Sequence, residues 1–110
     1  MYDEDLTMDE EHLLDVLREM HYGRQNVVSS RNLRHFGWEG SYIRELVHKL
    51  RVKGYPICSC NDGYYYGSDR DEVKQTINSI GSRIKKMMDV YSGLIGTYHL
   101  MDLRQEEGEE

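Results

Sequence analysis

The chain has 110 residues, of which 38% are hydrophobic and 31% are charged, and its formal net charge is −6. This length allows one domain with a small core and excludes a second domain. No apolar run approaches the ~18–20 residues that span a bilayer, and no basic-then-apolar leader opens the chain, so we expect a cytoplasmic protein without membrane association.

The first predicted element is a helix that starts at a capping box. Thr7 supplies a hydroxyl at the N-cap and Glu10 follows three residues later, which is the pattern of that motif. Apolar residues then recur at helical spacing: Leu13, Leu14, Val16, Leu17 and Met20. We expect this helix to end by Gly23.

Two further helices are expected before residue 54. Val27 and Val28 suggest a short strand, and Ser29 or Ser30 caps a helix that ends at Gly37. The next helix begins near residues 39–41 and ends before Gly54. Its apolar stripe comprises Ile43, Leu46, Val47 and Leu50.

Residues 54–66 predict a β-hairpin. Pro56 lacks a backbone donor and fits the start of an edge strand. Asn61 and Asp62 favour a turn, and Gly63 adopts positive φ without a steric penalty. Tyr64, Tyr65 and Tyr66 follow on the second strand, so their rings alternate between its two faces.

A long helix is predicted from Ser68 or Asp69 onwards, with Asp71 and Glu72 in its first turn, where the helix dipole favours anions. Apolar residues then alternate at spacings of four and three, which is a heptad pattern: Val73, Ile77, Ile80, Ile84, Met87, Tyr91, Leu94, Tyr98 and Met101. Gly81, Gly93 and Gly96 weaken the helix by roughly 1 kcal/mol each. We therefore expect a break near residues 93–96, with 97–105 as a separate short segment.

This apolar stripe has two interpretations. One is a homodimer seam formed by Ile77, Ile80, Ile84, Met87, Tyr91 and Leu94. The other is packing against the first helix of the same chain, whose apolar face also needs a cover. Self-association is the interpretation we favour, and both hold together if they involve different stretches.

The predicted fold class is α+β: a winged helix-turn-helix with a two-stranded wing and a long C-terminal helix. The expected division is an acidic arm over 1–6, the winged helix over 7–67, a helical dimerisation segment over 68–104 and a disordered acidic tail over 105–110.

The charges are segregated along the chain. Residues 1–23 carry a net charge of −7 and residues 24–67 carry +4, whereas residues 68–92 carry +1 and residues 93–110 carry −4. Binding depends on the local field more than on the total charge. The basic centre therefore favours a nucleic-acid partner, and the acidic ends oppose it.

Residues 12–67 resemble the winged helix-turn-helix of the biotin-repressor type. The resemblance is carried by Val28-Ser29-Ser30 followed by Leu33, by the buried positions of the third helix, by residues 50–57 and by Gly63-Tyr64. With the tail helix included, the chain is also similar to small winged-helix proteins of bacteriophages and prophages. No biotin-ligase portion is present, so that family's enzymatic activity is not implied.

The resemblance implies that the third helix reads DNA and that the wing touches the backbone or the minor groove. Arginine forms bidentate contacts with guanine, and lysine suits phosphates. The implied DNA-binding residues are Arg31, Ser41, Tyr42, Arg44, His48, Lys49, Arg51 and Asn61. Two acidic residues oppose such contacts, Glu39 at the start of the helix and Asp62 at the tip of the wing.

The expected function is sequence-specific binding of double-stranded DNA by a homodimer, in a phage or prophage transcription regulator or replication-related factor acting in the bacterial host cytoplasm. A two-fold dimer predicts half-sites about one turn, ~34 Å, apart or a multiple of it. The alternative is a protein-interaction module that binds and inhibits or recruits a host protein, with its acidic ends mimicking nucleic acid. A third interpretation is single-strand binding through exposed tyrosines.

We expect neither catalysis nor a cofactor. The sequence contains no nucleophile with an evident base and no phosphate-cradling glycine loop. Cys58 and Cys60 lie on one face of a strand, where a disulfide would be strained, which suits a reducing compartment. A zinc site needs four ligands within tetrahedral reach, and this Cys-x-Cys pair with scattered histidines does not supply that pattern: His12, His21, His35, His48 and His99.

Overall fold

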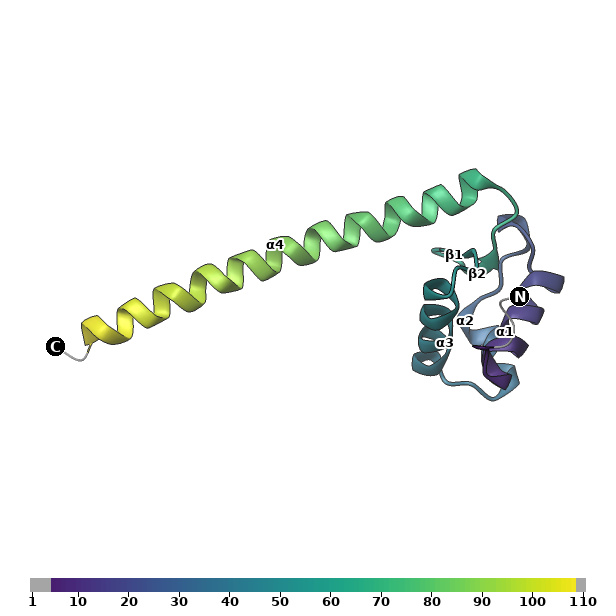
Figure 1. Ribbon diagram of the computed structural model, residues 1–110, viewed down its shortest axis with the longest axis horizontal. Helices are drawn as coiled ribbons and strands as arrows, with labels where there is room; N and C mark the ends of the chain where they lie inside the picture. Colours follow the sequence, from purple (N-terminus) through teal and green to yellow (C-terminus); the bar gives the residue numbers. More distant parts are fainter. Residues whose placement is uncertain (1–4, 109–110) are drawn as a thin grey trace. The chain divides into compact units, whose positions relative to one another are not determined.

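The computed structural model describes residues 5–108, with side chains described through Arg104. Three helices, α1 (Met8–Met20), α2 (Ser30–Leu33) and α3 (Gly40–Val52), precede a hairpin of β1 (Ile57–Cys60) and β2 (Gly63–Tyr66), and α4 (Arg70–Gly108) follows (Figure 1). Two 3₁₀ turns, η2 (Arg24–Asn26) and η3 (Arg34–Phe36), flank α2. The α+β fold class is the predicted one.

The predicted helix ends are confirmed at three places. Thr7 accepts a hydrogen bond from the backbone N–H of Glu10, and the carboxylate of Glu10 accepts one from the N–H of Thr7, which completes the capping box. Ser29 caps α2 through the N–H of Asn32. Gly37 ends η3 in the left-handed conformation, with φ of 89°.

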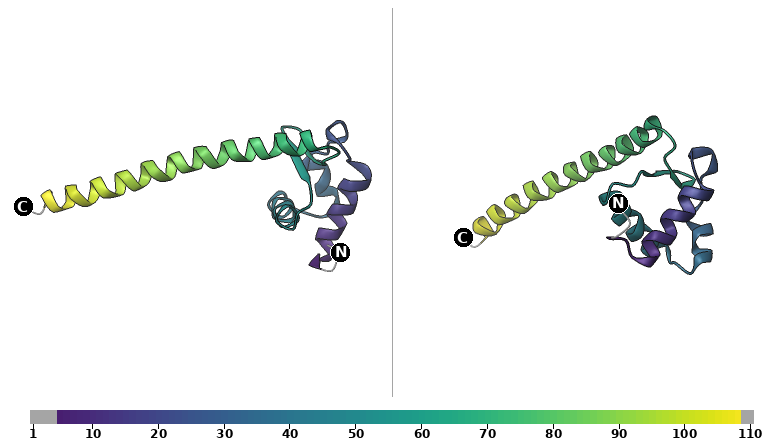
Figure 2. Two further views of the ribbon diagram at one scale, coloured as in Figure 1. Left: turned by 45° about the horizontal axis from the view of Figure 1, so that its top comes forward. Right: turned by 45° about the vertical axis from the view of Figure 1, so that its right-hand side comes forward.

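The hydrophobic core joins α1, α2 and α3 to one face of the hairpin. Leu13, Leu14 and Leu17 of α1 meet the apolar stripe of α3, and Leu33 and Trp38 close the core between them. The helices α1 and α3 pack against each other, and α1 also contacts β2. Figure 2 shows the two helices side by side below the hairpin.

The hairpin is antiparallel, with Cys60 paired to Gly63 across a two-residue turn. Gly63 has a φ of 142°, and a Cβ at this position would stand 1.9 Å from the carbonyl oxygen of Val28. The backbone of Val28 pairs with Tyr64 at this point through two hydrogen bonds of 2.9 Å. Only glycine lets the two segments approach this closely. The short strand expected at residues 27–28 is therefore present only as one bridge, between Val28 and Tyr64.

Both faces of the hairpin are covered. Ile57, Tyr64 and Tyr66 face the helical core, and Cys58 and Tyr65 occupy the opposite face, where each is 1% exposed. The start of α4 lies over this second face: the hydroxyl of Thr76 accepts a hydrogen bond from the N–H of Ser59 at 3.3 Å. The first turns of α4 therefore belong to the core of the domain.

Glu72 fastens the start of α4 to the loop that follows α1. Its carboxylate accepts hydrogen bonds from the backbone N–H of Arg24 at 2.9 Å and from the N–H and hydroxyl of Ser68 at 2.8 and 2.7 Å. Burial raises the pKa of Glu72, but these hydrogen bonds outweigh it and leave the pKa below its usual value. Asp69 caps α4 through the N–H of Glu72, as predicted.

The helix α4 is continuous to Gly108, so the predicted break near residues 93–96 is wrong. Glycine lowers helix propensity but keeps its N–H donor, so scattered glycines do not interrupt the hydrogen-bond ladder as proline would. The backbone is also helical over residues 105–108, where a disordered tail was expected, and residues 109–110 lie outside the described part of the chain, as do residues 1–4 of the expected acidic arm.

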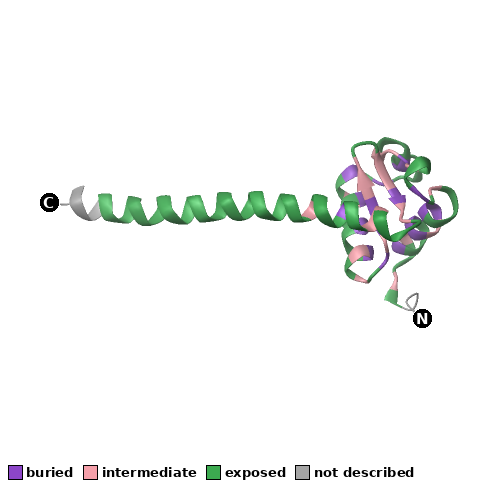
Figure 3. Cartoon of the chain, turned by 90° about the horizontal axis from the view of Figure 1, so that it is seen from above, coloured by how far each residue is buried: buried purple, intermediate pink, exposed green. Residues whose placement is uncertain are grey.

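The chain divides into two compact units between Thr76 and Ile77, inside α4, whereas the sequence placed the boundary between residues 67 and 68. Among residues 77–104 every side chain is exposed except that of Ile80, which is half-buried (Figure 3). In the described part of the chain, no helix is long and apolar enough to traverse a bilayer.

Candidate nucleic-acid interface

The solvent-facing side of α3 displays four of the predicted DNA-binding residues. Ser41, Arg44, His48 and Lys49 are all exposed, because they alternate around the helix with the buried stripe. The ammonium of Lys49 lies 3.2 Å from the carboxylate of Glu45 one turn earlier, and both side chains are about half-exposed. Such an exposed pair contributes little to stability. The ammonium of Lys49 can therefore leave Glu45 for another anion at little cost.

Tyr42, another of the predicted DNA-binding residues, is half-buried. The phenol is partly buried against the core, and its hydroxyl donates a 2.6 Å hydrogen bond to the carboxylate of Asp9 in α1. That hydrogen bond, with some burial, raises the pKa of Tyr42. The hydroxyl of Tyr42 is thus engaged with the start of α1, and the DNA-binding role expected for this residue stays a prediction.

Arg51 is also engaged within the domain. Its Nε donates to the carbonyl of Ile57 at 2.7 Å and its Nη2 donates to the hydroxyl of Ser59 at 3.0 Å. The chain reverses at Gly54, and this reversal brings β1 back within reach of the guanidinium. Arg51 thus fixes the base of the wing to α3, and the DNA-binding role expected for it stays a prediction.

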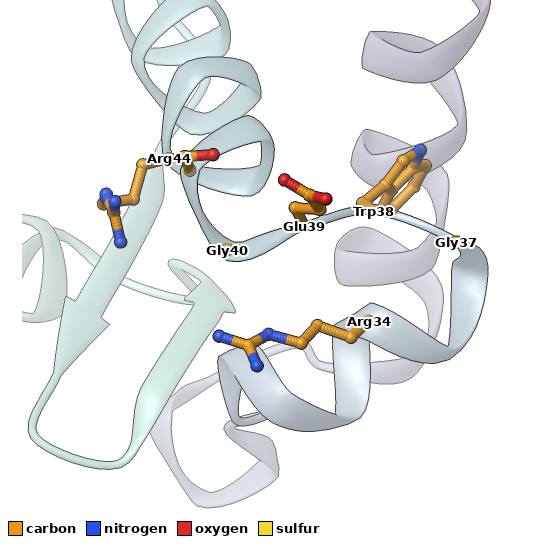
Figure 4. Close-up of a pocket in the computed structure, with 7 residues that line it drawn as sticks. Arg34, Gly37, Trp38, Glu39, Gly40 and Arg44 are labelled. Carbon is orange, nitrogen blue, oxygen red and sulfur yellow. The ribbon is translucent and has the colours of Figure 1, made fainter.

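A shallow hollow of about 620 Å³ lies at the N-terminus of α3, between α2 and the start of that helix. Arg34, Trp38, Glu39, Ser41 and Arg44 contribute to its lining. Figure 4 shows Arg34 extending from the α2 side beneath Gly40, with the carboxylate of Glu39 above. A Cβ at Gly40 would stand 3.0 Å from Nη2 of Arg34, so glycine allows the guanidinium to lie against the helix end.

Arg34 was missed in the sequence-based set, although Arg31 one turn earlier was included. Both are exposed. The sequence signal was available, because residues three apart on a short helix share a face. No side-chain hydrogen bond caps α3, since Glu39 makes none to the helix, and the first N–H groups of a helix carry a partial positive charge. Arg34 and Arg44, which both line the hollow, and this helix end therefore create a positive field that Glu39 partly offsets.

The tip of the wing is polar, with Asn61 and Asp62 both exposed. The three wing tyrosines do not form a stacking surface. Tyr65 is buried, and Tyr64 and Tyr66 pack against the core. Tyr66 also stacks on Tyr22, with their ring centroids 6.0 Å apart. All three rings therefore pack within the domain.

An aromatic group flanks the hollow on the side of α1. Trp38 is buried and stacks on Phe36 at 5.5 Å, and the ring of His12 meets both edge-on at 5.1 and 5.2 Å. Phe36 remains 43% exposed. These rings fix the turn that leads into α3.

Cys58 and Cys60 are both free thiols, the first buried and the second half-buried. Burial raises the pKa of Cys58, against a hydrogen bond from Thr76 that lowers it. Among the residues whose side chains the structure describes, no three histidine, cysteine, aspartate or glutamate residues come together in a way that would hold a metal ion.

The residues predicted for dimerisation lie on one side of α4 within residues 77–94. Ile77, Ile84, Met87, Tyr91 and Leu94 are all exposed, by 59–71%, and Ile80 is half-buried. In the structure, the apolar stripe of this segment therefore remains open to solvent.

No protein-family model matches this chain, and neither a curated protein nor a solved structure matches it. The topology is that of three helices, a two-stranded hairpin and a long helix, which is compatible with a winged helix.

Proposed function

We propose that this protein binds double-stranded DNA with sequence specificity as a homodimer, in the manner of a transcription regulator or a replication-related factor. Its third helix reads the major groove, and the wing contacts the adjacent backbone. The observation that carries the proposal is a cluster of exposed basic residues on α3 and on the helical segment that precedes it: Arg31, Arg34, Arg44, His48 and Lys49.

The division of roles within this cluster follows from chemistry. Arg44 projects from the exposed face of α3, where a guanidinium meets the O6 and N7 acceptors of guanine. Arg31 and Arg34 lie on the preceding helical segment, where contacts to phosphates set the register of the protein on the duplex. Lys49 leaves its weak ion pair with Glu45 for a phosphate. The resemblance of residues 12–67 to biotin-repressor-type domains supports the same placement.

A second function, docking onto a host protein, is favoured by the mixed character of the surface around the hollow. Glu39 lines the hollow between the arginines, and Tyr42 and Arg51 are engaged within the domain. The exposed basic face is thus smaller and more mixed in charge than the sequence indicated. The exposed edge of Phe36 next to the hollow adds an apolar contact of the kind that protein interfaces use.

The test is selection of a random duplex pool on the purified full chain, followed by binding of the enriched sequence to Arg44→Ala/Lys49→Ala. We expect an enriched motif with two-fold symmetry and an affinity loss of about 10- to 100-fold in the variant. The affinity should also fall steeply with salt, because phosphate contacts release counterions.

Arg18→Ala/Lys74→Ala is the matched control. Both side chains are exposed, and the ion pair of Arg18 with Asp15 is exposed as well, so this variant also loses two positive charges without touching the proposed interface. Equal weakening by both variants, or no enrichment even at low salt, would contradict sequence-specific DNA binding. A partner retained at salt that abolishes DNA binding would support the host-protein alternative.

A further inference from the structure

The described part of α4 beyond Thr76 exposes more apolar surface than a monomer normally carries. Ten large apolar side chains between Ile77 and Met101, on the side of the helix that carries the heptad stripe, are each exposed by 41–71%. At roughly 100 Å² each, they amount to on the order of 1,000 Å², which exceeds both the largest patch of a typical monomer and the ~800 Å² per partner of a stable interface. A second copy of this chain is the occupant of matching area and chemistry, an assignment that rests on the self-association in the proposed function.

The stripe has a heptad order in which positions a and d face a partner helix and positions e and g flank them. Position a is occupied by Ile77, Ile84, Tyr91 and Tyr98, and position d by Ile80, Met87, Leu94 and Met101. The flanking e positions are Gly81, Met88 and Ile95, and the g positions are Arg83, Val90 and Thr97. From Ile84 to Tyr98, the flanks therefore carry no charge.

We propose that the α4 helices of two copies pair antiparallel about a two-fold axis near Asp89. In this register Ile84 meets the partner's Leu94, and Met87 meets the partner's Tyr91. A two-fold interface must be self-complementary, and this register keeps the entire stripe from Ile77 to Met101 in contact.

Side-chain size favours the antiparallel orientation. A parallel pair would place Tyr91 and Tyr98 each against its own copy, in two crowded layers. The antiparallel pair opposes each tyrosine with a smaller aliphatic side chain, the partner's Met87 or the partner's Ile80. It also sets Ile95 against the partner's Gly81. A Cβ added at Gly81 would meet nothing within 4 Å, so there is room beside this glycine for a large side chain. Cores fill best when large and small residues alternate across facing positions.

A surface hollow gives independent support. Ile80, Ile84, Met87 and Met88, together with Arg83, line an apolar depression of about 390 Å³. The antiparallel register brings the partner's Leu94 and the partner's two seam tyrosines over this depression, as knobs into a hole. A parallel pair would instead place over this depression the partner's copies of the side chains that line it.

The same register explains the uncharged flanks. Met88 and Val90 lie closest to the two-fold axis, where each meets its own copy across the interface. They would remain half-exposed on the rim of a parallel pair, where charged residues are usual. Because Ile77 lies opposite the partner's Met101, the two Ile77 residues are about 36 Å apart along the helix axis, at 1.5 Å per residue.

Disulfide trapping in the full chain tests the orientation without DNA. Ile84→Cys and Leu94→Cys are made separately in a Cys60→Ser background, which removes the half-buried thiol and retains the buried Cys58. Each variant is oxidised alone and after mixing, and the products are identified by intact mass. We expect a cross-linked product only in the mixture, formed between the two different variants, because a disulfide requires Cα atoms within about 7 Å.

Ser79→Cys and Ser92→Cys are the matched controls, because both exposed serines lie outside positions a, d, e and g, and their mixture should not cross-link. Cross-links within each variant alone would establish a parallel pair and overturn the proposal. A monomeric mass by light scattering, with no cross-link in any sample, would also overturn it. Either result leaves the duplex-selection experiment to decide DNA binding separately.

Discussion

Two helices of this protein carry the same kind of apolar stripe and use it differently. In α3 the stripe of Ile43, Leu46, Val47 and Leu50 is at most 2% exposed, because α1 and the hairpin cover it. In α4 the stripe beyond Thr76 is exposed except at Ile80, which is half-buried. Periodicity thus identifies an apolar helix face but not the surface that covers it. The difference in exposure distinguishes residues that hold the domain together from residues that are available for association.

The largest expected effect comes from making the same substitution in both stripes. Leu46→Ala removes a buried side chain and should lower the free energy of unfolding by about 2–5 kcal/mol, since it also leaves a cavity. Leu94→Ala removes a side chain that is 64% exposed, so it should leave the domain folded and weaken association only. Urea denaturation and sedimentation equilibrium measure the two effects. Comparable loss of domain stability in both variants would contradict the comparison.

A glycine of the domain core sharpens the comparison between the covered and the exposed region. Gly63→Ala should destabilise the domain by roughly 1–3 kcal/mol, because the residue combines a φ of 142° with a Cβ that would overlap the Val28 carbonyl. The thermal unfolding midpoint measures the loss. A stable Gly63→Ala variant would mean that the hairpin and residue 28 are in looser contact than the structure shows.

Glu10 links α1 to α3 in the covered region, and its effect depends on pH. Its carboxylate is 1% exposed and accepts hydrogen bonds of 2.8 and 3.0 Å from the ammonium of Lys53. Burial raises the pKa of Glu10, but the hydrogen bonds from Lys53 and Thr7 outweigh it and keep the pKa below its usual 4.5. The stabilisation is therefore present above pH 4.5 and is lost as the pH falls through the lowered pKa.

Glu10→Gln should cost about 1–3 kcal/mol at neutral pH, because the half-buried ammonium of Lys53 loses its charged partner. The difference from the unsubstituted chain should shrink below pH 4.5. Denaturant titrations at several pH values measure it, with the exposed Glu19→Gln as a control that stays flat. A difference that is constant with pH would contradict the role of the ionised carboxylate.

The smallest expected effect, and one of opposite sign, is in α4. Gly93→Ala lies outside the seam positions, and a Cβ there would meet nothing within 4 Å. It should increase helix stability by about 1 kcal/mol, seen as a gain in helicity by circular dichroism. A loss of helicity or of association would show that Gly93 makes a close contact in the assembled protein.

Most of the fold was predictable because the signals are local. The capping box at Thr7, the cap at Ser29 and the hairpin turn before Gly63 each depend on groups within a few residues, and all three are present. The candidate site was predicted less well. Arg44, His48 and Lys49 are exposed as expected, whereas Tyr42 and Arg51 are held by groups that helical periodicity does not reveal.

The sequence by itself determined where the helices and the hairpin lie and which faces of them are apolar, since hydrogen-bonding and side-chain periodicity are set by neighbouring residues. Only the tertiary structure decided that Tyr42 bonds Asp9 across 33 positions, that Gly63 meets Val28 and that α4 contributes Thr76 to the covering of the hairpin. Those contacts join segments far apart in the chain, and they form because closing the core brings the segments together.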